Sequence, residues 1–221
     1  MTRDLQPGRV IAVYGAKRGV GTTTVACNLA LALRSATGAD VALVDGEQNF
    51  GGVSTMMGLP ARRCQAPLVE HDSGVLVAAP EAGGLDVLVD EARRRAEWVV
   101  VDTPSLLTPA SVRVLQRSER VLLVVTPEEA ALRHAHAFLD YCAERDLASD
   151  VRVVVNRSGS QSAVPIARLE ELFGRRLLAH LESNGRLVVA AVNNGEPFVS
   201  AQPEQRLSVQ VRQLARSLVA A

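Results

Sequence analysis

Short apolar runs rich in β-branched residues recur along the chain, and polar or turn residues bound each of them. Their brevity and their β-branched side chains favour buried strands over helix fragments, because helices need longer periodic segments. Runs without alternation are typical of parallel strands that are covered on both faces. The predicted strands are Arg9–Tyr14, Val41–Asp45, Val75–Ala79, Trp98–Asp102, Val121–Thr126 and Val151–Asn156.

Helix-length segments lie between these strands. The predicted helices are Thr23–Ser35, Leu85–Ala96, Thr108–Gln116, Glu128–Arg145 and Val164–Phe173. Thr126-Pro127-Glu128-Glu129 predicts a helix start, with proline in the first turn and acids near the positive end of the helix dipole. Strand–helix alternation of this kind predicts right-handed crossovers. We therefore expect an α/β fold, a doubly wound, mostly parallel sheet with helices on both faces, in a single domain over residues 1–221.

The composition adds limits on function. Hydrophobic residues make up 48% and charged residues 22% of the 221 residues, which is ordinary for a globular protein. A formal net charge of zero argues against a main role in neutralising nucleic acid, so nucleic acid is not an expected partner. The three cysteines form no CxxC pair, which argues against a zinc site or a disulfide framework. With no signal-peptide pattern and no apolar run approaching ~18 residues, we expect a cytoplasmic protein.

Polar residues follow the ends of four predicted strands. Residues 17–24 follow the first strand, Asp45 and Glu47 end the second, Asp102 ends the WVVVD strand, and Asn156 ends VRVVVN. Because ligands of such sheets bind at the carboxyl ends of the strands, these residues are expected to converge on one edge. The alternative is that they are turn formers and helix caps, which also favour Asp and Asn.

The segment 14-YGAKRGVGTTTVACNLA-30 has the form of a phosphate-binding loop. Such a loop points successive backbone N–H groups inward and ends at the positive end of a helix. Gly19 and Gly21 supply the backbone freedom that this requires. Thr23 is placed to ligate Mg²⁺, and Asp102 matches the carboxylate that holds the metal from a neighbouring strand.

The strict pattern GxxxxGK[ST] is broken at two positions, because Ala16 replaces its first glycine and Thr22 replaces its lysine. The loop alone therefore leaves open a strand–turn–helix with only a structural role. Lys17 is the single lysine among the 24 Lys and Arg residues, and it lies in this loop. This placement is either chance or a sign that the position needs a compact, flexible ammonium and not a guanidinium.

The run KRGVGTTT resembles the deviant phosphate loop KGGVGKTT of the MinD/ParA family of P-loop ATPases, and Lys17 falls on the signature lysine of that loop. VALVDGEQNFGG resembles the second acidic motif of the family, with Asp45 and Glu47 on its two acids. WVVVDTPS is similar to the Walker B strand, and Asn156-Arg157 matches the Asn-Arg pair on the adenine side. The late segment NGRLVVAAVNNGEPFV is similar as well, so the resemblance spans nearly the whole chain.

The resemblance implies ATP or ADP together with Mg²⁺ as cofactors, and a homodimer that sandwiches the nucleotide. The implied nucleotide-binding residues are Lys17, Arg18, Gly19, Val20, Gly21, Thr22, Thr23, Thr24, Asn156 and Arg157. The implied metal residues are Thr23 and Asp102, and the implied catalytic residues are Lys17, Asp45 and Glu47.

Within the family, DGEQNFGGVSTMMGLP and HDSGVLVAAPEAGGLD look most like the CpaE/TadZ branch. That branch implies a localisation or assembly factor for a polar machine such as a Tad-type pilus or secretion system. The expected partners are proteins of a membrane-associated pilus, secretion or division machine, at the inner face of the membrane or a cell pole of a bacterium. Members of the branch often carry a receiver-like domain ahead of the ATPase, whereas this chain starts at the ATPase strand. The alternative is an active ATP-hydrolysing switch in septum siting or in DNA or cargo partitioning.

Three departures affect the expected chemistry. Thr22 offers a hydroxyl but no charge, Glu47 is one methylene longer than the usual aspartate, and Arg18 stands where the family has glycine. Arg18 could restore charge near the phosphates or hinder a dimer partner. The hypothesis is a nucleotide-binding or vestigial scaffold with weak or absent ATPase activity, and its competitor is a true ATPase in which Lys17 or Arg18 supplies the charge.

The last predicted helix, QRLSVQVRQLARSLVAA, has Leu207, Val211, Leu214 and Leu218 at helical spacing. Such a stripe either packs against the core or, as the resemblance to MinD suggests, contacts a membrane surface. The segment has no aromatic anchor or lysine-rich flank, which favours the core.

Overall fold

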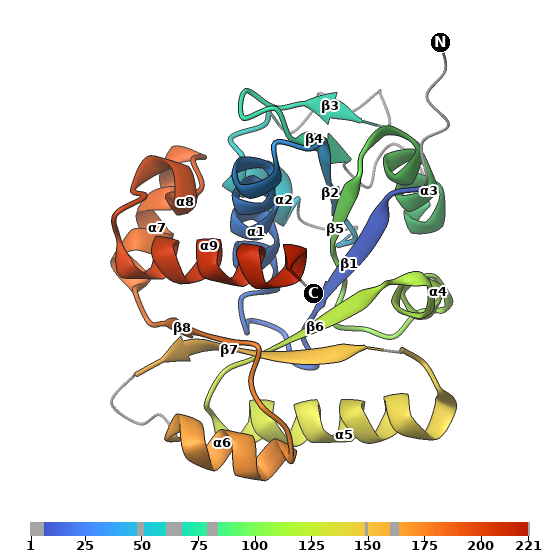
Figure 1. Cartoon of the computed structure of the whole chain (residues 1–221), viewed down its shortest axis with the longest axis vertical. Helices are drawn as coiled ribbons and strands as arrows, with labels where there is room; N and C mark the ends of the chain where they lie inside the picture. The colour runs from blue at the N-terminus through green and yellow to red at the C-terminus, as the bar shows by residue number, and fades with distance from the viewer. Residues whose placement is uncertain are drawn as a thin grey trace.

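The computed structural model describes residues 7–47, 51–60, 68–78, 84–148, 150–159 and 164–220. Within these ranges, one sheet of eight strands has the order β3-β4-β2-β5-β1-β6-β7-β8 (Figure 1). All neighbouring strands are parallel except β3 and β4, which are antiparallel. The strands are β1 Arg9–Tyr14, β2 Val41–Asp45, β3 Val69–Glu70, β4 Leu76–Ala78, β5 Trp98–Asp102, β6 Arg120–Val125, β7 Val151–Ser158 and β8 Ala179–Glu182.

Helices cover both faces of this sheet, as the α/β prediction required. The helices are α1 Thr22–Thr37, α2 Gly52–Met56, α3 Leu85–Arg95, α4 Pro109–Arg117, α5 Glu129–Arg145, α6 Ile166–Phe173, α7 Gly185–Asn194, α8 Phe198–Ala201 and α9 Arg206–Val219. One hydrophobic cluster joins the sheet to α1, α2, α7, α8 and α9, and a second joins its other face to α3, α4, α5 and α6. The doubly wound fold is therefore confirmed.

Strand β1 shows why the two clusters are separate. Successive side chains of a strand point to opposite faces. Ile11 and Val13 accordingly lie in the first cluster, and Val10, Ala12 and Tyr14 in the second. All five are buried, which explains why the strand reads as a continuous apolar run.

The predicted elements appear with small changes at their ends. The helix expected from Glu128 begins at Glu129, and Pro127 precedes it, so the prediction of a proline in the first helical turn was wrong. β7 continues two residues past Asn156, to Ser158. The expected residue Ala79 lies outside the described residues. The short strands β3 and β8 were not predicted, because neither contains the long β-branched run that marked the others.

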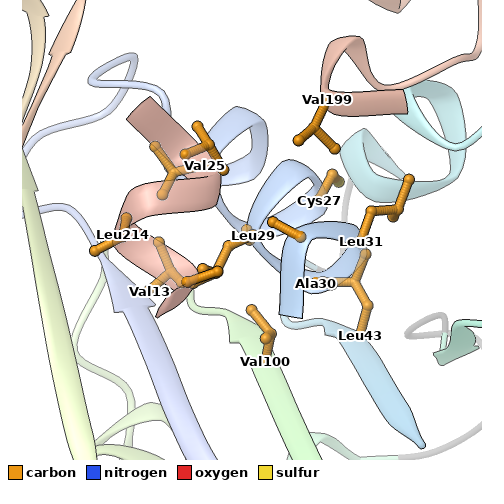
Figure 2. Close-up of a cluster of buried hydrophobic side chains, with 14 of the residues drawn as sticks. Val13, Val25, Cys27, Leu29, Ala30, Leu31, Leu43, Val100, Val199 and Leu214 are labelled. Carbon is orange, nitrogen blue, oxygen red and sulfur yellow. The ribbon is translucent and has the colours of Figure 1, made fainter. Parts of the chain in front are cut away.

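Helix α9 packs on α1, and its apolar stripe belongs to the core. Leu207, Val211, Leu214 and Leu218 are all buried in the first cluster. Figure 2 shows α9, which carries Leu214, next to α1, which carries Leu29, with Val13 and Val100 on the strands that the two helices cover. The core-packing interpretation is confirmed, and the alternative in which this stripe contacts a membrane is wrong. No helix in the described ranges is both long and apolar enough to cross a bilayer.

Val211→Ala should lower the free energy of unfolding by roughly 2 kcal/mol, because it removes two buried methyl groups and leaves a cavity beside α1. Val211 is 0% exposed, whereas Val219 on the last turn of the same helix is 39% exposed. Val219→Ala is therefore the matched control and should change stability by less than about 0.5 kcal/mol. Urea unfolding of both variants checks this; equal losses would contradict the packing of α9.

Candidate functional site

The loop from Gly15 to Gly21 leads from the carboxyl end of β1 into the first turn of α1. Gly19 and Gly21 have φ of 81° and 97°, which L side chains rarely adopt. Gly21 is the N-cap of α1, and no side chain caps it. The first N–H groups of a helix lack intrahelical partners, so those of residues 22–24 are placed to bind an anion at the positive end of the dipole. The first turn also contains no acidic residue that would oppose this.

Asn156, near the end of β7, holds this loop in place through a hydrogen bond. Its Nδ2 donates a hydrogen bond of 2.8 Å to the carbonyl of Val20, and its Oδ1 accepts one of 2.9 Å from the N–H of Arg157. Arg157 has φ of 57°, an uncommon conformation for a residue other than glycine. The resemblance implied a nucleotide contact for Asn156. In the structure its amide fixes the loop, while one hydrogen of Nδ2 is left over for a ligand.

Gly21→Ala should destabilise the protein more than Gly19→Ala. Both positions have positive φ, so both substitutions are strained by about 1 kcal/mol. A Cβ on Gly21 would also overlap Nδ2 of Asn156, whereas a Cβ on Gly19 would meet nothing within 4 Å. We expect Gly19→Ala to lose about 1 kcal/mol and Gly21→Ala about 2–3 kcal/mol by urea unfolding. Equal losses would show that Asn156 does not hold the loop.

Thr23 and Asp102 form the centre of the site. Thr23 Oγ1 donates a hydrogen bond of 2.6 Å to Asp102 Oδ2. Asp102 is 2% exposed, and within the described part of the chain its Oδ1 is buried without a hydrogen-bond partner. Asp45 is its register partner across β2 and β5. The two acids therefore lie side by side at the carboxyl edge of the sheet, as expected from the strand ends.

The pKa of Asp102 is raised from 3.8 to about 7, chiefly by burial and to a smaller extent by the nearby Asp45 and Glu47. The hydrogen bond from Thr23 acts in the opposite direction and stabilises the carboxylate, and the nearby Thr22 hydroxyl adds a smaller effect of the same sign. No positive side chain among the described residues acts on this pKa to offset the burial. A carboxyl group with a strongly raised pKa in a cleft is a candidate for a functional role.

The residues present fit Mg²⁺. A hydroxyl and a carboxylate are hard oxygen ligands, and Oδ1 of Asp102 lacks a partner that a cation or its water would supply. Across the described ranges, the protein has no group of three His, Cys, Asp or Glu side chains able to hold a metal alone. A magnesium ion at Thr23 and Asp102 would therefore need further oxygens from phosphates and water, as is usual for Mg²⁺.

Two backbone N–H groups donate hydrogen bonds to the carboxylate of Asp45. Its Oδ1 accepts a hydrogen bond of 3.0 Å from the N–H of Glu47, and its Oδ2 accepts one of 3.3 Å from the N–H of Val53 in α2. Asp45 is 1% exposed, whereas Glu47 lies at the surface of a cavity. The two acids predicted as catalytic are therefore neighbours, but they face different surroundings. Residues 48–50 of that motif lie outside the described residues.

Two cavities open on either side of the loop. A cavity of about 210 Å³ is bounded at its polar end by Gly21, Thr24, Asn156 and Arg157. Apolar side chains of α7, α8 and α9, including Val188, Phe198, Leu207 and Val211, form another part of its wall, and residues 182–185 line the rest together with Val25 and Leu181. The sequence analysis gave no site role to the β8–α7 loop that closes it, although 183-SNG-185 ahead of an apolar helix was a usable turn and cap signal.

A second cavity, of about 520 Å³, lies on the opposite side of the loop. Its walls include Arg18 of the loop, Gly46 and Glu47 after β2, and Pro104 after β5. Leu106, which lines it, is 67% exposed. The predicted nucleotide and metal residues therefore do gather around one loop, between these two cavities. The second cavity lies on the same side as Asp102.

The fold of the described residues is that of the MinD/ParA P-loop proteins. No family model matches the chain. Its sequence is 25% identical to the septum site-determining protein MinD of Bacillus subtilis. The alignment is 244 positions long, gaps included, and covers 96% of this chain and 89% of that protein. It is 26% identical to the antiactivator FleN of Pseudomonas aeruginosa, in an alignment of 246 positions, gaps included, that covers 97% of this chain and 88% of that protein.

Solved structures show the same fold. The cell division ATPase MinD of Pyrococcus furiosus has a TM-score of 0.85 at 22% identity, covering 96% of this chain and 99% of that chain. A MinD of Pyrococcus horikoshii, in complex with Mg-ADP, has a TM-score of 0.83 at 20% identity, covering 96% of both chains. These similarities support the predicted relation to the MinD/ParA P-loop proteins.

Proposed function

We propose that this protein binds ADP or ATP with Mg²⁺ at the loop and hydrolyses ATP weakly or not at all. The observation that carries the proposal is the hydrogen bond between Thr23, at the start of α1, and the buried Asp102, whose second carboxylate oxygen lacks a partner in the described structure. The MinD of Pyrococcus horikoshii, which shares the fold, is described in complex with Mg-ADP. A phosphate-bound Mg²⁺ would supply the positive charge that offsets the burial of Asp102.

The other predicted residues take roles that follow from their positions. Backbone N–H groups of residues 19–24 would hold the phosphates. This segment contains the two positive-φ glycines and the first turn of α1. The 210 Å³ cavity beside Asn156 and Arg157 would receive the adenine side of the nucleotide, because apolar side chains of α7, α8 and α9 line one part of it and polar groups line the rest.

Weak hydrolysis follows from the charges around the loop. Position 22 carries a neutral threonine, and the Lys17 ammonium lies 3.7 Å from Glu128 Oε2, at the start of α5. Both side chains of that pair are exposed enough that the contact is weak and Lys17 can leave it. Glu47 keeps an acid near Asp45, but its longer arm would change the orientation of an attacking water, to which hydrolysis is sensitive at about 1 Å.

We propose further that the protein acts as a homodimeric localisation or assembly factor. Its partners would be proteins of a membrane-associated machine such as a Tad-type pilus, at the inner face of the membrane or a cell pole. The runs around 45-DGEQNFGG-52 and 71-HDSGVLVA-78 support this branch. The second candidate is an ATP-hydrolysing switch in septum siting, which the similarity to MinD of Bacillus subtilis favours.

Phosphate release at high protein concentration separates the two candidates. If the protein is a scaffold, the rate of ATP hydrolysis should be near background in both the wild type and Lys17→Ala. Robust turnover that Lys17→Ala abolishes would reject the scaffold and establish the ATP-hydrolysing switch.

Calorimetric titration with Mg-ADP and Mg-ATP tests binding itself. Thr23→Val should weaken binding of Mg-nucleotide at least tenfold and should remove the benefit of added Mg²⁺, because it deletes the metal-facing hydroxyl. Thr37→Val, at the last turn of the same helix, removes a hydroxyl that donates to the Leu33 carbonyl, far from the loop, and is the matched control. No detectable binding by the wild type at millimolar nucleotide would reject the proposal.

A further inference from the structure

The phosphate loop carries an unusual distribution of charge. The P-loop pattern places a lysine directly before the metal-binding Ser/Thr, where this chain has Thr22. Polyphosphate needs cationic partners, so a working site must take the missing charge from another residue. Lys17 and Arg18 are the two cationic side chains between β1 and α1.

These two side chains point to opposite sides of the loop. Strand β1 lies between β5 and β6 in the sheet. Lys17 contacts Glu128, which follows β6. Arg18 lines the 520 Å³ cavity together with Glu47, which follows β2, and Pro104, which follows β5. The Thr23–Asp102 pair joins α1 to the end of β5. Arg18 therefore lies on the side of the loop that faces the proposed Mg²⁺ site, which is called the metal side below, and Lys17 lies on the other side.

Arg18 is also free to bind a ligand. It is exposed, and no hydrogen bond or ion pair engages it within the described ranges. Arg113, the other arginine of the same cavity, differs in this respect, because its Nε and Nη2 donate bonds of 2.8 and 2.6 Å to Asp86 Oδ2. The next residue, Gly19, has open space around it, so the loop tip leaves room for the guanidinium to reorient.

We propose that Arg18 binds the terminal phosphates of the Mg-nucleotide held by its own chain and supplies the charge that Thr22 lacks. This rests on the proposed function of the site. A guanidinium suits the role because its planar fork can bind two phosphate oxygens at once, and because it remains charged at every physiological pH. It also reaches the phosphates from the metal side, where the loop has no other cation.

The test is a double-mutant cycle in nucleotide affinity. Mg-ATP, Mg-ADP and AMP are titrated into the wild type, Arg18→Gln, Thr22→Lys and the double variant, at protein concentrations where each is monomeric. Arg18→Gln should weaken Mg-ATP binding about tenfold or more in the wild type but less than threefold in the Thr22→Lys background, because a lysine at position 22 makes Arg18 redundant. AMP, which lacks terminal phosphates, should bind all four proteins equally well.

Arg113→Gln is the control, since it removes a guanidinium from the same cavity that already has an acidic partner. It should leave the affinity for Mg-ATP unchanged. Unchanged binding by Arg18→Gln, or an equal loss in both backgrounds, would overturn the proposal for Arg18 while leaving the site a nucleotide site. Failure of both the wild type and Thr22→Lys to bind any nucleotide would overturn the proposed function and this proposal together.

Discussion

Thr22→Lys should raise the affinity for Mg-ATP and Mg-ADP by roughly 30-fold to several thousand-fold. This range comes from the 2–5 kcal/mol that removing one partner of a buried, hydrogen-bonded charge pair typically costs, at ~1.4 kcal/mol per decade. Position 22 is the first residue of α1, so a lysine there would add its ammonium to the N–H groups that face the phosphates. If Arg18 already supplies part of this charge, the gain should lie near the lower limit. Calorimetric titration gives the affinities directly.

Thr22→Met is the matched control, because methionine is unbranched and of similar length to lysine but carries no charge. It should bind nucleotide no better than the wild type. Equal gains from both substitutions would show that chain length, and not charge, limits binding. The absence of any gain with lysine would mean that no phosphate lies beside position 22.

Most of the fold could be predicted because its strands are short, β-branched and covered on both faces, so that local sequence and tertiary environment agree. The Thr23–Asp102 pair could also be predicted, since the loop pattern and the end of the WVVVD strand each place one member. β8 could not, because its residues AHLE have no strand signal and it forms by pairing with β7 at the edge of the sheet.

The remaining features of the site depend on contacts between distant segments. Asn156 reaches the carbonyl of Val20 across 136 positions of sequence, so no local pattern reveals that it braces the loop. The opposite directions of Lys17 and Arg18 likewise depend on the segments after β6 and β2, which the fold brings to either side of the loop. The raised pKa of Asp102 reflects how deeply the folded chain buries it, which spacing alone does not predict.

Asp102→Asn should stabilise the protein in the absence of nucleotide and metal, by up to about 4 kcal/mol at pH 8. A pKa of about 7, against an ordinary value of 3.8, means that an ionised carboxylate in this buried site destabilises the folded state. Asparagine keeps an oxygen that accepts the bond from Thr23 but carries no charge. Urea unfolding of both proteins at several pH values measures the difference.

The pH dependence identifies the cause. Below about pH 4, Asp102 is protonated in both the folded and the unfolded wild type. In that range its burial therefore does not make the free energy of unfolding depend on pH. Between about pH 4 and 7 the folded state keeps the proton that the unfolded state releases, so the contribution of Asp102 to wild-type stability falls as pH rises, and it is lowest above the folded-state pKa of about 7. The advantage of Asp102→Asn should therefore grow across this range and stay constant at higher pH.

Asp90→Asn is the control, since Asp90 is a partly exposed carboxylate paired with Arg117 and should change stability by less than about 1 kcal/mol at any pH. Added Mg-ADP should then reverse the order at pH 8, because the ion stabilises the wild-type carboxylate and gains little from the neutral amide. Lower stability of Asp102→Asn than of the wild type at pH 8 without ligand would contradict this account. Such a result would mean that the chain itself already compensates the charge of Asp102, and the unpartnered oxygen would no longer indicate a metal.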